Sequence, residues 1–258
     1  MSDSVITQRH ENILEIALNR PEAYNAFNLD MMKMLGEAMA SAAVDDSIKG
    51  VLVTGKGKAF CSGGDLKWIS QQSEDAGSVL YRLAPLFHLA VTEIRRIGKP
   101  VVAVINGIAA GGGFSLALAC DFRVLGQSAI LRQAYTSSGL SMDGGGSFAL
   151  PRLVGVARAM EIMAFDEPIS SAKALEWGLV TKAVADEEVQ KEALAILQGL
   201  AKTAIHSFSW SKKLMIDSFS NTLETQLELE RQGISDCAAH PEGQEGIKAF
   251  VEKRKPSF

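Results

Sequence analysis

The stretch KPVVAVINGIAAGGGFSLALACD, residues 99–121, decides the fold of this chain. Its β-branched apolar run, residues 101–105, has the length and composition of a fully buried strand. The Asn-Gly pair at 106–107 interrupts that run, because both residue types accept positive φ at low cost. Three glycines follow at 111–113, and residues 114–119 then predict a short buried helix. The unpaired backbone N–H groups at such a glycine-rich helix start lie where the helix dipole is positive, so this place favours a negative charge.

Four other interpretations of this stretch compete. Residues 101–120 carry no charge and are long enough to span a bilayer, but the glycines and the Asn-Gly pair interrupt them. A phosphate-binding loop needs Lys-Ser or Lys-Thr after its last glycine, where Phe114 and Ser115 stand. Residues 113–117 nearly match the serine nucleophile elbow of hydrolases, with Ser115 as nucleophile, but that elbow follows its strand immediately. Close packing of a helix on a sheet, without chemistry, is the fourth interpretation.

Composition limits the classes of function. At 258 residues, with 47% hydrophobic and 22% charged residues, the chain resembles an ordinary soluble globular protein. The net charge of −4 and the lack of a Lys/Arg block argue against a nucleic-acid partner. Three widely spaced cysteines predict free thiols in a reducing compartment, and the N-terminus lacks an apolar signal core, so we expect a cytoplasmic protein. The four scattered histidines predict no metal site.

The first part of the chain predicts an α/β layered fold. Strands and helices alternate along it. A strand followed by a glycine-rich turn and then a helix occurs twice, around Gly64 and around Gly112. The expected segments are a hairpin (5–9 and 13–18), a helix capped by Asn28 that ends near residue 43, a strand (51–54), a helix (79–97) and a strand (122–125).

From residue 157 onward the pattern is mainly helical. Ser170 caps a helix that Gly178 closes, a short strand follows at 180–184, and later helices are expected at 187–201, 207–219, 221–239 and 241–254. We divide the chain into a core, residues 1–200, and a helical C-terminal region, residues 201–258. The apolar stripes of that region predict contacts between subunits.

Two glycine-rich helix starts can direct two backbone N–H groups at one oxygen. Such a pair stabilises an enolate or a tetrahedral oxyanion, and the loss of one donor typically lowers the rate by about 10²–10³.

Five segments together resemble the crotonase (enoyl-CoA hydratase/isomerase) superfamily over essentially the full length. They are Asn19-Arg20-Pro21 with Asn25-Ala26, residues 59–66 (AFCSGGDL), residues 99–113, Trp177-Gly178-Leu179-Val180, and residues 249–254 (AFVEKR). The resemblance implies a ββα-spiral core and a helical C-terminal region that builds trimers or hexamers (dimers of trimers). It also implies an acyl-CoA thioester substrate, with coenzyme A as part of that substrate and no further cofactor.

The resemblance also implies roles for particular residues. The N–H groups of Gly64 and Gly112 would form the oxyanion hole. Coenzyme A would be bound by residues of three segments: Ala23, Tyr24 and Ala26; Ser62 and Leu66, near the adenine; and Phe250 and Lys253, at the nucleotide end.

The chain departs from the hydratases at their two catalytic glutamates, whose positions hold Ser115 and Tyr135. Neither residue is a carboxylate base, so simple hydration is not expected unless a bound water is held in another way. Asp143 matches the acid/base aspartate of crotonase isomerases that act on ring-derived acyl-CoAs, and one base suffices for isomerisation. The alternative role of Asp143 is the N-cap of the following helix.

His88 supports a second chemistry. In 4-chlorobenzoyl-CoA dehalogenase, which the chain also resembles, the matching positions hold a histidine base and a nucleophilic aspartate. Gly64 and Tyr135, however, replace aromatic residues of that enzyme. His88 also fits a packed histidine on an apolar helix face. We therefore favour an enoyl-CoA isomerase that acts on an unsaturated or ring-derived acyl-CoA over the dehalogenase, a hydratase, a Ser115 hydrolase and a catalytically silent acyl-CoA-binding protein.

Overall fold

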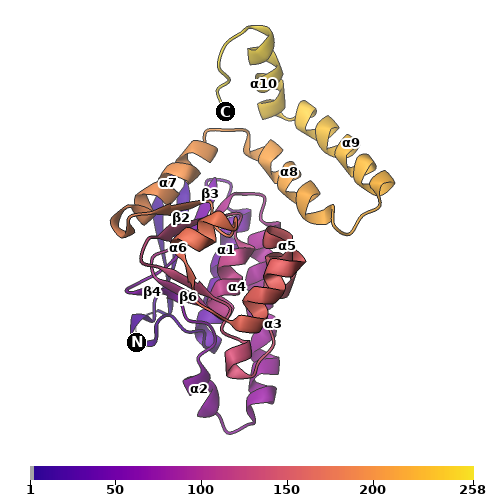
Figure 1. The fold of residues 1–258 in the computed structure, drawn as a ribbon. Helices are drawn as coiled ribbons and strands as arrows, with labels where there is room; N and C mark the ends of the chain where they lie inside the picture. The colour runs from indigo at the N-terminus through magenta and orange to yellow at the C-terminus, as the bar shows by residue number, and fades with distance from the viewer. Residues whose placement is uncertain (1–2) are drawn as a thin grey trace.

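A six-stranded sheet forms the centre of the computed structural model, which describes residues 3–258 (Figure 1). Its strand order is β1-β2-β3-β5-β7-β10, with only the β1–β2 pair antiparallel. The strands are β1 (Val5–His10), β2 (Ile13–Leu18), β3 (Gly50–Gly55), β5 (Val101–Ile105), β7 (Phe122–Gly126) and β10 (Lys182–Val184). The predicted hairpin and the predicted buried strands are thus confirmed.

Both faces of this sheet are covered along its inner strands, which explains why β3 and β5 are continuously buried and mainly apolar, whereas the edge strand β1 is mostly exposed. Val51 and Val53 of β3 belong to the larger apolar core, together with residues of α1 (Leu29–Val44), α3 (Ala76–Arg96) and α4 (Gly112–Ala119). Leu52, between them, points to the other face and packs with α7 (Val189–Leu200). The period-two alternation therefore sorts the side chains between two layers of helices.

A second sheet of four short strands lies beside the first and was not predicted. Its order is β4-β6-β8-β9, from β4 (Ala59–Cys61), β6 (Ile108–Ala110), β8 (Ile130–Arg132) and β9 (Ile169–Ser170). The chain passes from the first sheet to the second at Asn106 and Gly107, neither of which has positive φ. The predicted reason for that break was wrong. Gly107 is needed because a Cβ there would lie 2.1 Å from the carbonyl oxygen of Lys58.

Three predicted helix ends are confirmed. Asn28 caps α1 through its side chain, Ser170 caps α6, and Gly178 has the left-handed φ of +72° after that helix. The remaining helices are α2 (Leu66–Ser70), α5 (Gly146–Phe165), α6 (Ser171–Glu176), α8 (Ile205–Asp217), α9 (Leu223–Ala239) and α10 (Pro241–Val251), with 3₁₀ turns at Pro21–Ala23, Thr136–Ser138 and Asp186–Glu188.

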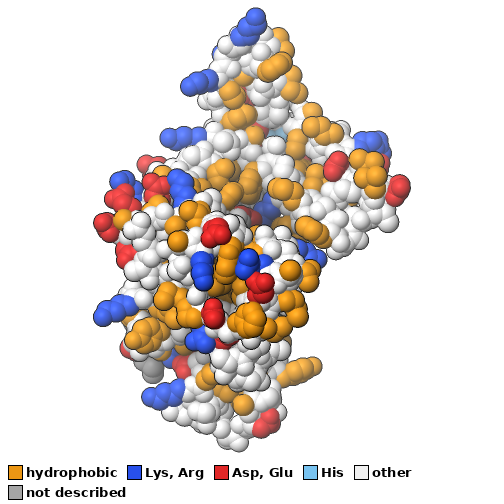
Figure 2. All heavy atoms as spheres, in the orientation of Figure 1, with side chains coloured by type: hydrophobic (Ala, Val, Ile, Leu, Met, Phe, Trp, Pro, Cys, Tyr) orange, Lys and Arg blue, Asp and Glu red, His pale blue; other side chains and the backbone are white. Residues whose placement is uncertain are grey.

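Helices α8–α10 form an arm that projects from the core (Figure 1). Apolar side chains are exposed along this arm and on the outer side of α5 (Figure 2), including Val156, Met160, Leu223, Leu227, Ile234, Ile247 and Phe250. These are the surfaces on which we expect the predicted contacts between subunits. Across residues 3–258, no helix has the length and apolar character that a membrane crossing requires.

Candidate active site

Both predicted glycine turns reach the same cavity, which has a volume of about 400 Å³. Gly64 and Gly112 line it together with Asp143, the one acidic side chain in its described wall. The rest of the wall is mainly apolar and is contributed by Phe27, Met32, Ser62, Leu66, Leu80, Leu83, Ala84, Phe87, Gly111, Ala134, Tyr135, Ser138, Leu140, Ser141 and Met142.

The turn at Gly64 is held by polar residues that sequence reasoning left without a role. The Arg20 guanidinium lies 2.9 Å from the Asp65 carboxylate and also donates to the carbonyl of Ala26. The buried Asn25 side chain accepts from the N–H of Arg20 and donates to the carbonyls of two residues around the β3–β4 turn. Asp65 in turn caps α2. Arg20 and Asp65 are 45 positions apart, so no local pattern pairs them.

The turn at Gly112 lies against the first turn. A Cβ on Gly63 would be 3.0 Å from the backbone nitrogen of Gly112, which shows how closely the two segments approach. Gly112 is the first residue of α4, where the N–H has no partner within the helix. Among residues 3–258, no acceptor binds the N–H of Gly64 or that of Gly112. Two unpaired donors therefore border one cavity.

Asp143 is placed by a glycine that follows it. Gly144 has φ +60°, and a Cβ there would lie 2.1 Å from the Phe87 ring, so only glycine lets this loop lie on α3. The Asp143 carboxylate then meets the imidazole of His88, with 2.5 Å between Oδ1 and Nε2. Both side chains are partly exposed, at 40% and 51%.

The structure excludes the alternative interpretation of each of these two residues. Asp143 is not a helix cap, because α5 begins after Gly145 without any side-chain cap. His88 is not packed on the apolar face of its helix, since it points out of that stripe to the carboxylate.

Ser115 and Tyr135 form a hydroxyl pair beneath the loop. The Ser115 Oγ and the Tyr135 Oη are 3.1 Å apart, and the phenol donates to the backbone carbonyl of Asp143 at 3.2 Å. Burial raises the pKa of Tyr135 to about 12, so the phenol stays neutral at physiological pH. Within the described chain, neither a histidine nor a carboxylate bonds to Ser115, so the elbow interpretation has no base for its serine.

The residues expected at coenzyme A fall into two groups. Ser62 and Leu66 line the cavity, and Ser62 donates from its N–H to the carbonyl of Tyr24. Ala23 and Ala26 lie in the same neighbouring segment as Tyr24, whose side chain is 56% exposed.

Phe250 and Lys253 are not brought to this cavity. Phe250 lies on α10, which is at the opposite end of the molecule from α2, and it is 85% exposed (Figure 1). Lys253 follows two residues after the end of that helix.

Cysteine and metal chemistry add nothing to the cavity wall. Cys61 and Cys120 are buried free thiols, and burial raises the pKa of each to about 12, whereas Cys237 is partly exposed. In the part of the chain that the structure describes, no three His, Cys, Asp or Glu side chains gather closely enough to hold a metal ion.

Comparison with known proteins gives the family. The sequence profile described as Enoyl-CoA hydratase/isomerase matches residues 8–258. The chain belongs to this family. It is 33% identical over 262 residues to 1,2-epoxyphenylacetyl-CoA isomerase of Escherichia coli strain K12, covering 100% of this chain and 99% of that protein. It is 32% identical to 4-chlorobenzoyl coenzyme A dehalogenase-2 of an Arthrobacter species, covering 99% and 94%.

Solved structures agree. A crystal structure of an enoyl-CoA hydratase from Polaromonas sp. JS666 superposes with a TM-score of 0.93, at 36% identity and 98% coverage of both chains. The expected crotonase fold is thereby confirmed, and the chain is a crotonase-family acyl-CoA enzyme. These relatives are named as an isomerase, a dehalogenase and a hydratase at similar identity, so sequence identity does not decide which reaction this chain catalyses.

Proposed function

We propose that this crotonase-family enzyme is an isomerase of an unsaturated or ring-derived acyl-CoA, with Asp143 as its acid/base group. The observation that supports this is the pairing of one carboxylate with two unpaired N–H groups, those of Gly64 and Gly112, around a single cavity. An enolate needs both elements: a base that removes the proton, and donors that stabilise the resulting oxygen charge.

The reaction needs one base and no water. The Asp143 carboxylate removes a proton from one carbon of the acyl chain, and the electron pair moves through the conjugated system onto the thioester oxygen. The N–H groups of Gly64 and Gly112 hold that enolate oxygen. Asp143 then returns the proton to a different carbon, and the double bond is displaced. Tyr135 supports this step by bonding the backbone carbonyl of Asp143.

The His88–Asp143 contact favours a second candidate, dehalogenase-like hydrolysis. In that reaction the carboxylate attacks an aryl carbon, halide leaves, and His88 activates the water that cleaves the aryl ester. We place this second, because in the isomerase His88 also has a simple role: it orients the carboxylate.

A product assay distinguishes the reactions. The enzyme is incubated with a 3-enoyl-CoA, a 2-enoyl-CoA and 4-chlorobenzoyl-CoA, and products are identified by mass and by chromatography. The isomerase yields a product of unchanged mass from the first. Hydration adds the mass of water to the second, and dehalogenation replaces chlorine by hydroxyl in the third. Binding without any product would identify a silent acyl-CoA-binding protein and contradict the proposal.

Two variants and a control assign the base. Asp143→Asn should lower isomerase kcat by about 10²–10⁴, the usual contribution of a general acid/base group. His88→Gln should lower it by less than about tenfold, because the contact is half-exposed. Asp46→Asn, at an exposed carboxylate far along the chain, should leave it unchanged. An Asp143→Asn enzyme with wild-type kcat would refute the assignment.

We also propose that the enzyme acts as a trimer or a dimer of trimers. Because α10 points away from its own cavity, we place Phe250 and Lys253 at the coenzyme A of a neighbouring subunit. Equilibrium sedimentation tests the assembly, and a monomer with full activity would contradict this placement.

A further inference from the structure

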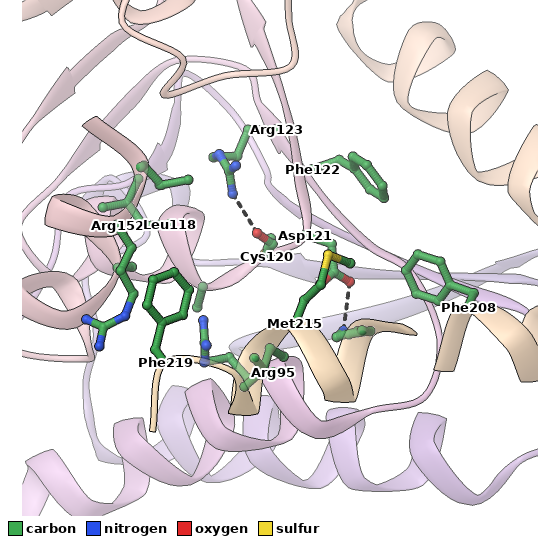
Figure 3. A pocket seen from close by; sticks show the side chains of 15 residues that line it. Arg95, Leu118, Cys120, Asp121, Phe122, Arg123, Arg152, Phe208, Met215 and Phe219 are labelled. Carbon is green, nitrogen blue, oxygen red and sulfur yellow. Dashed lines mark hydrogen bonds and ion pairs between the residues drawn. The ribbon is translucent and has the colours of Figure 1, made fainter. Parts of the chain in front are cut away.

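A second cavity, of about 370 Å³, lies between the core and α8 (Figure 3). It shares no lining residue with the candidate active site. Its wall comes from the end of α3, the segment from α4 to β7, the first half of α5, and α8. Its volume is in the range of small-molecule sites.

The charges in this wall are unbalanced. Four cationic side chains line it, Arg95, Arg123, Arg152 and Lys212, against the single carboxylate of Asp121. That carboxylate already forms an ion pair with the ammonium group of Lys212, with 2.7 Å between Oδ2 and Nζ. Arg123 is buried and donates only to backbone carbonyls.

Arg95 and Arg152 are left with no carboxylate partner in residues 3–258. Arg152 stacks on the rings of Phe148, at 3.4 Å, and Phe219, at 4.9 Å, and Arg95 lies 5.1 Å from the Phe148 ring. Burial lowers the pKa of Arg95; the charge of Asp121 opposes this shift and the charge of Arg152 adds to it, but an arginine remains protonated. Two like charges are therefore held close together, an arrangement that a bound anion would stabilise.

The stacking leaves part of each guanidinium edge free: one Nη of Arg152 donates to the carbonyl of Phe148 at 2.8 Å, and none of the described residues accepts from its other N–H groups or from those of Arg95. A guanidinium covered on its face by an aromatic ring keeps its N–H edge available, and that edge matches the two oxygens of a carboxylate. The remaining wall is apolar, with Leu118, Leu153, Phe208, Met215, Ile216 and Phe219. An occupant that satisfies both parts has an anionic head and an apolar tail.

We propose that this cavity binds a monocarboxylate with an apolar chain, its carboxylate on Arg95 and Arg152 and its chain along α8. Such a ligand would connect α8 to α5, the helix that begins three residues after Asp143. It would therefore link the C-terminal arm to the segment that carries the catalytic carboxylate. This inference does not depend on which acyl-CoA reaction the enzyme catalyses.

Isothermal titration with sodium octanoate tests the proposal on the full-length enzyme. We expect one site per chain. Arg95→Gln and Arg152→Gln should each weaken binding by about tenfold or more, the effect of losing a hydrogen-bonded charge. Arg95→Lys keeps the charge but loses the two-pronged guanidinium edge, so it should bind more tightly than Arg95→Gln and more weakly than the wild type. Arg96→Gln, at the adjacent exposed arginine, should bind like the wild type.

Two further ligands test the two halves of the site. Octan-1-ol, which has the chain without the charge, and inorganic phosphate, which has charge without a chain, should both bind at least about tenfold more weakly than octanoate. Phosphate that binds as tightly as octanoate would overturn the apolar part. Octanoate affinity that is equal in wild type and both Gln variants would mean binding elsewhere, such as in the catalytic cavity, and would overturn the proposal. Arg152 is exposed, so its variant keeps the test valid even if Arg95→Gln does not fold.

Discussion

Lys99 begins the stretch that decides the fold, and its replacement by methionine should destabilise the protein strongly. The side chain is only 8% exposed. Its ammonium group donates to three backbone carbonyls at the end of α1, those of Ala42, Ala43 and Asp45, at 2.6, 3.2 and 2.8 Å. It thus caps the negative end of one helix from the start of the central strand β5.

The expected cost follows from these contacts. A hydrogen bond to a charged group contributes about 1.5–3 kcal/mol, and three share this ammonium. The cost of burying the charge, which lowers the pKa of Lys99, offsets part of that sum. Methionine retains most of the side-chain volume, so no large cavity is added. We therefore expect Lys99→Met to lower the free energy of unfolding by about 2–4 kcal/mol.

Urea unfolding followed by circular dichroism, at one protein concentration, measures the difference. Lys49→Met is the matched control: this lysine is also partly buried, but none of the described residues accepts from its ammonium, and its change should stay within about 0.5 kcal/mol. A loss below about 1 kcal/mol for Lys99→Met, with an unchanged m-value, would refute the reasoning.

Three further predictions concern the sheet and the site. Burial raises the pKa of Glu15, but hydrogen bonds from three side chains outweigh that effect and hold this pKa below its ordinary value. Its stabilising effect is therefore present above the unfolded-state pKa and lost as the pH falls through the lower folded-state value, so Glu15→Gln should flatten the acid side of stability measured from pH 3 to 7. Tyr135→Phe should lower kcat by less than about tenfold, whereas a loss of about 10³ would make the phenol an acid in the reaction. Because the pKa of Tyr135 is about 12, the pH profile of kcat/KM should show no tyrosine ionisation up to about pH 10. Gly112→Ala should lower kcat/KM by about 10² in steady-state assays, because the added Cβ would lie 2.9 Å from the Phe27 ring and displace the start of the helix. An unchanged kcat/KM would argue against an oxyanion role for Gly112.

Local patterns were enough to predict the main sheet and its helices. Its central strands β3 and β5 are apolar runs rich in β-branched residues. Residues such as Asn28 and Ser170 act as caps through bonds that span only three positions. The second sheet could not be predicted this way. Its strands are two or three residues long, too short for a periodic signal, and pairing with distant segments stabilises them.

The candidate site likewise contains residues that could be located from the sequence and residues whose placement depends on distant contacts. The two glycine turns could be located from sequence, as could Asp143, through the family resemblance. The interpretation of His88 as a packed histidine failed because it follows directly after Phe87, which belongs to the buried stripe, and helical periodicity does not decide how a flanking residue orients. Its partner lies 55 positions away, on a loop whose path depends on a positive φ at Gly144.

The claim that Asp143 alone exchanges a proton with a carbon of the acyl chain can be measured most directly by deuterium incorporation. The enzyme is incubated with its acyl-CoA substrate in D₂O, and label at the acyl carbons is followed by NMR. We predict rapid exchange with wild type and a decrease of at least about 10² in Asp143→Asn, with substrate binding retained. Exchange that continues at the wild-type rate in Asp143→Asn would contradict the account.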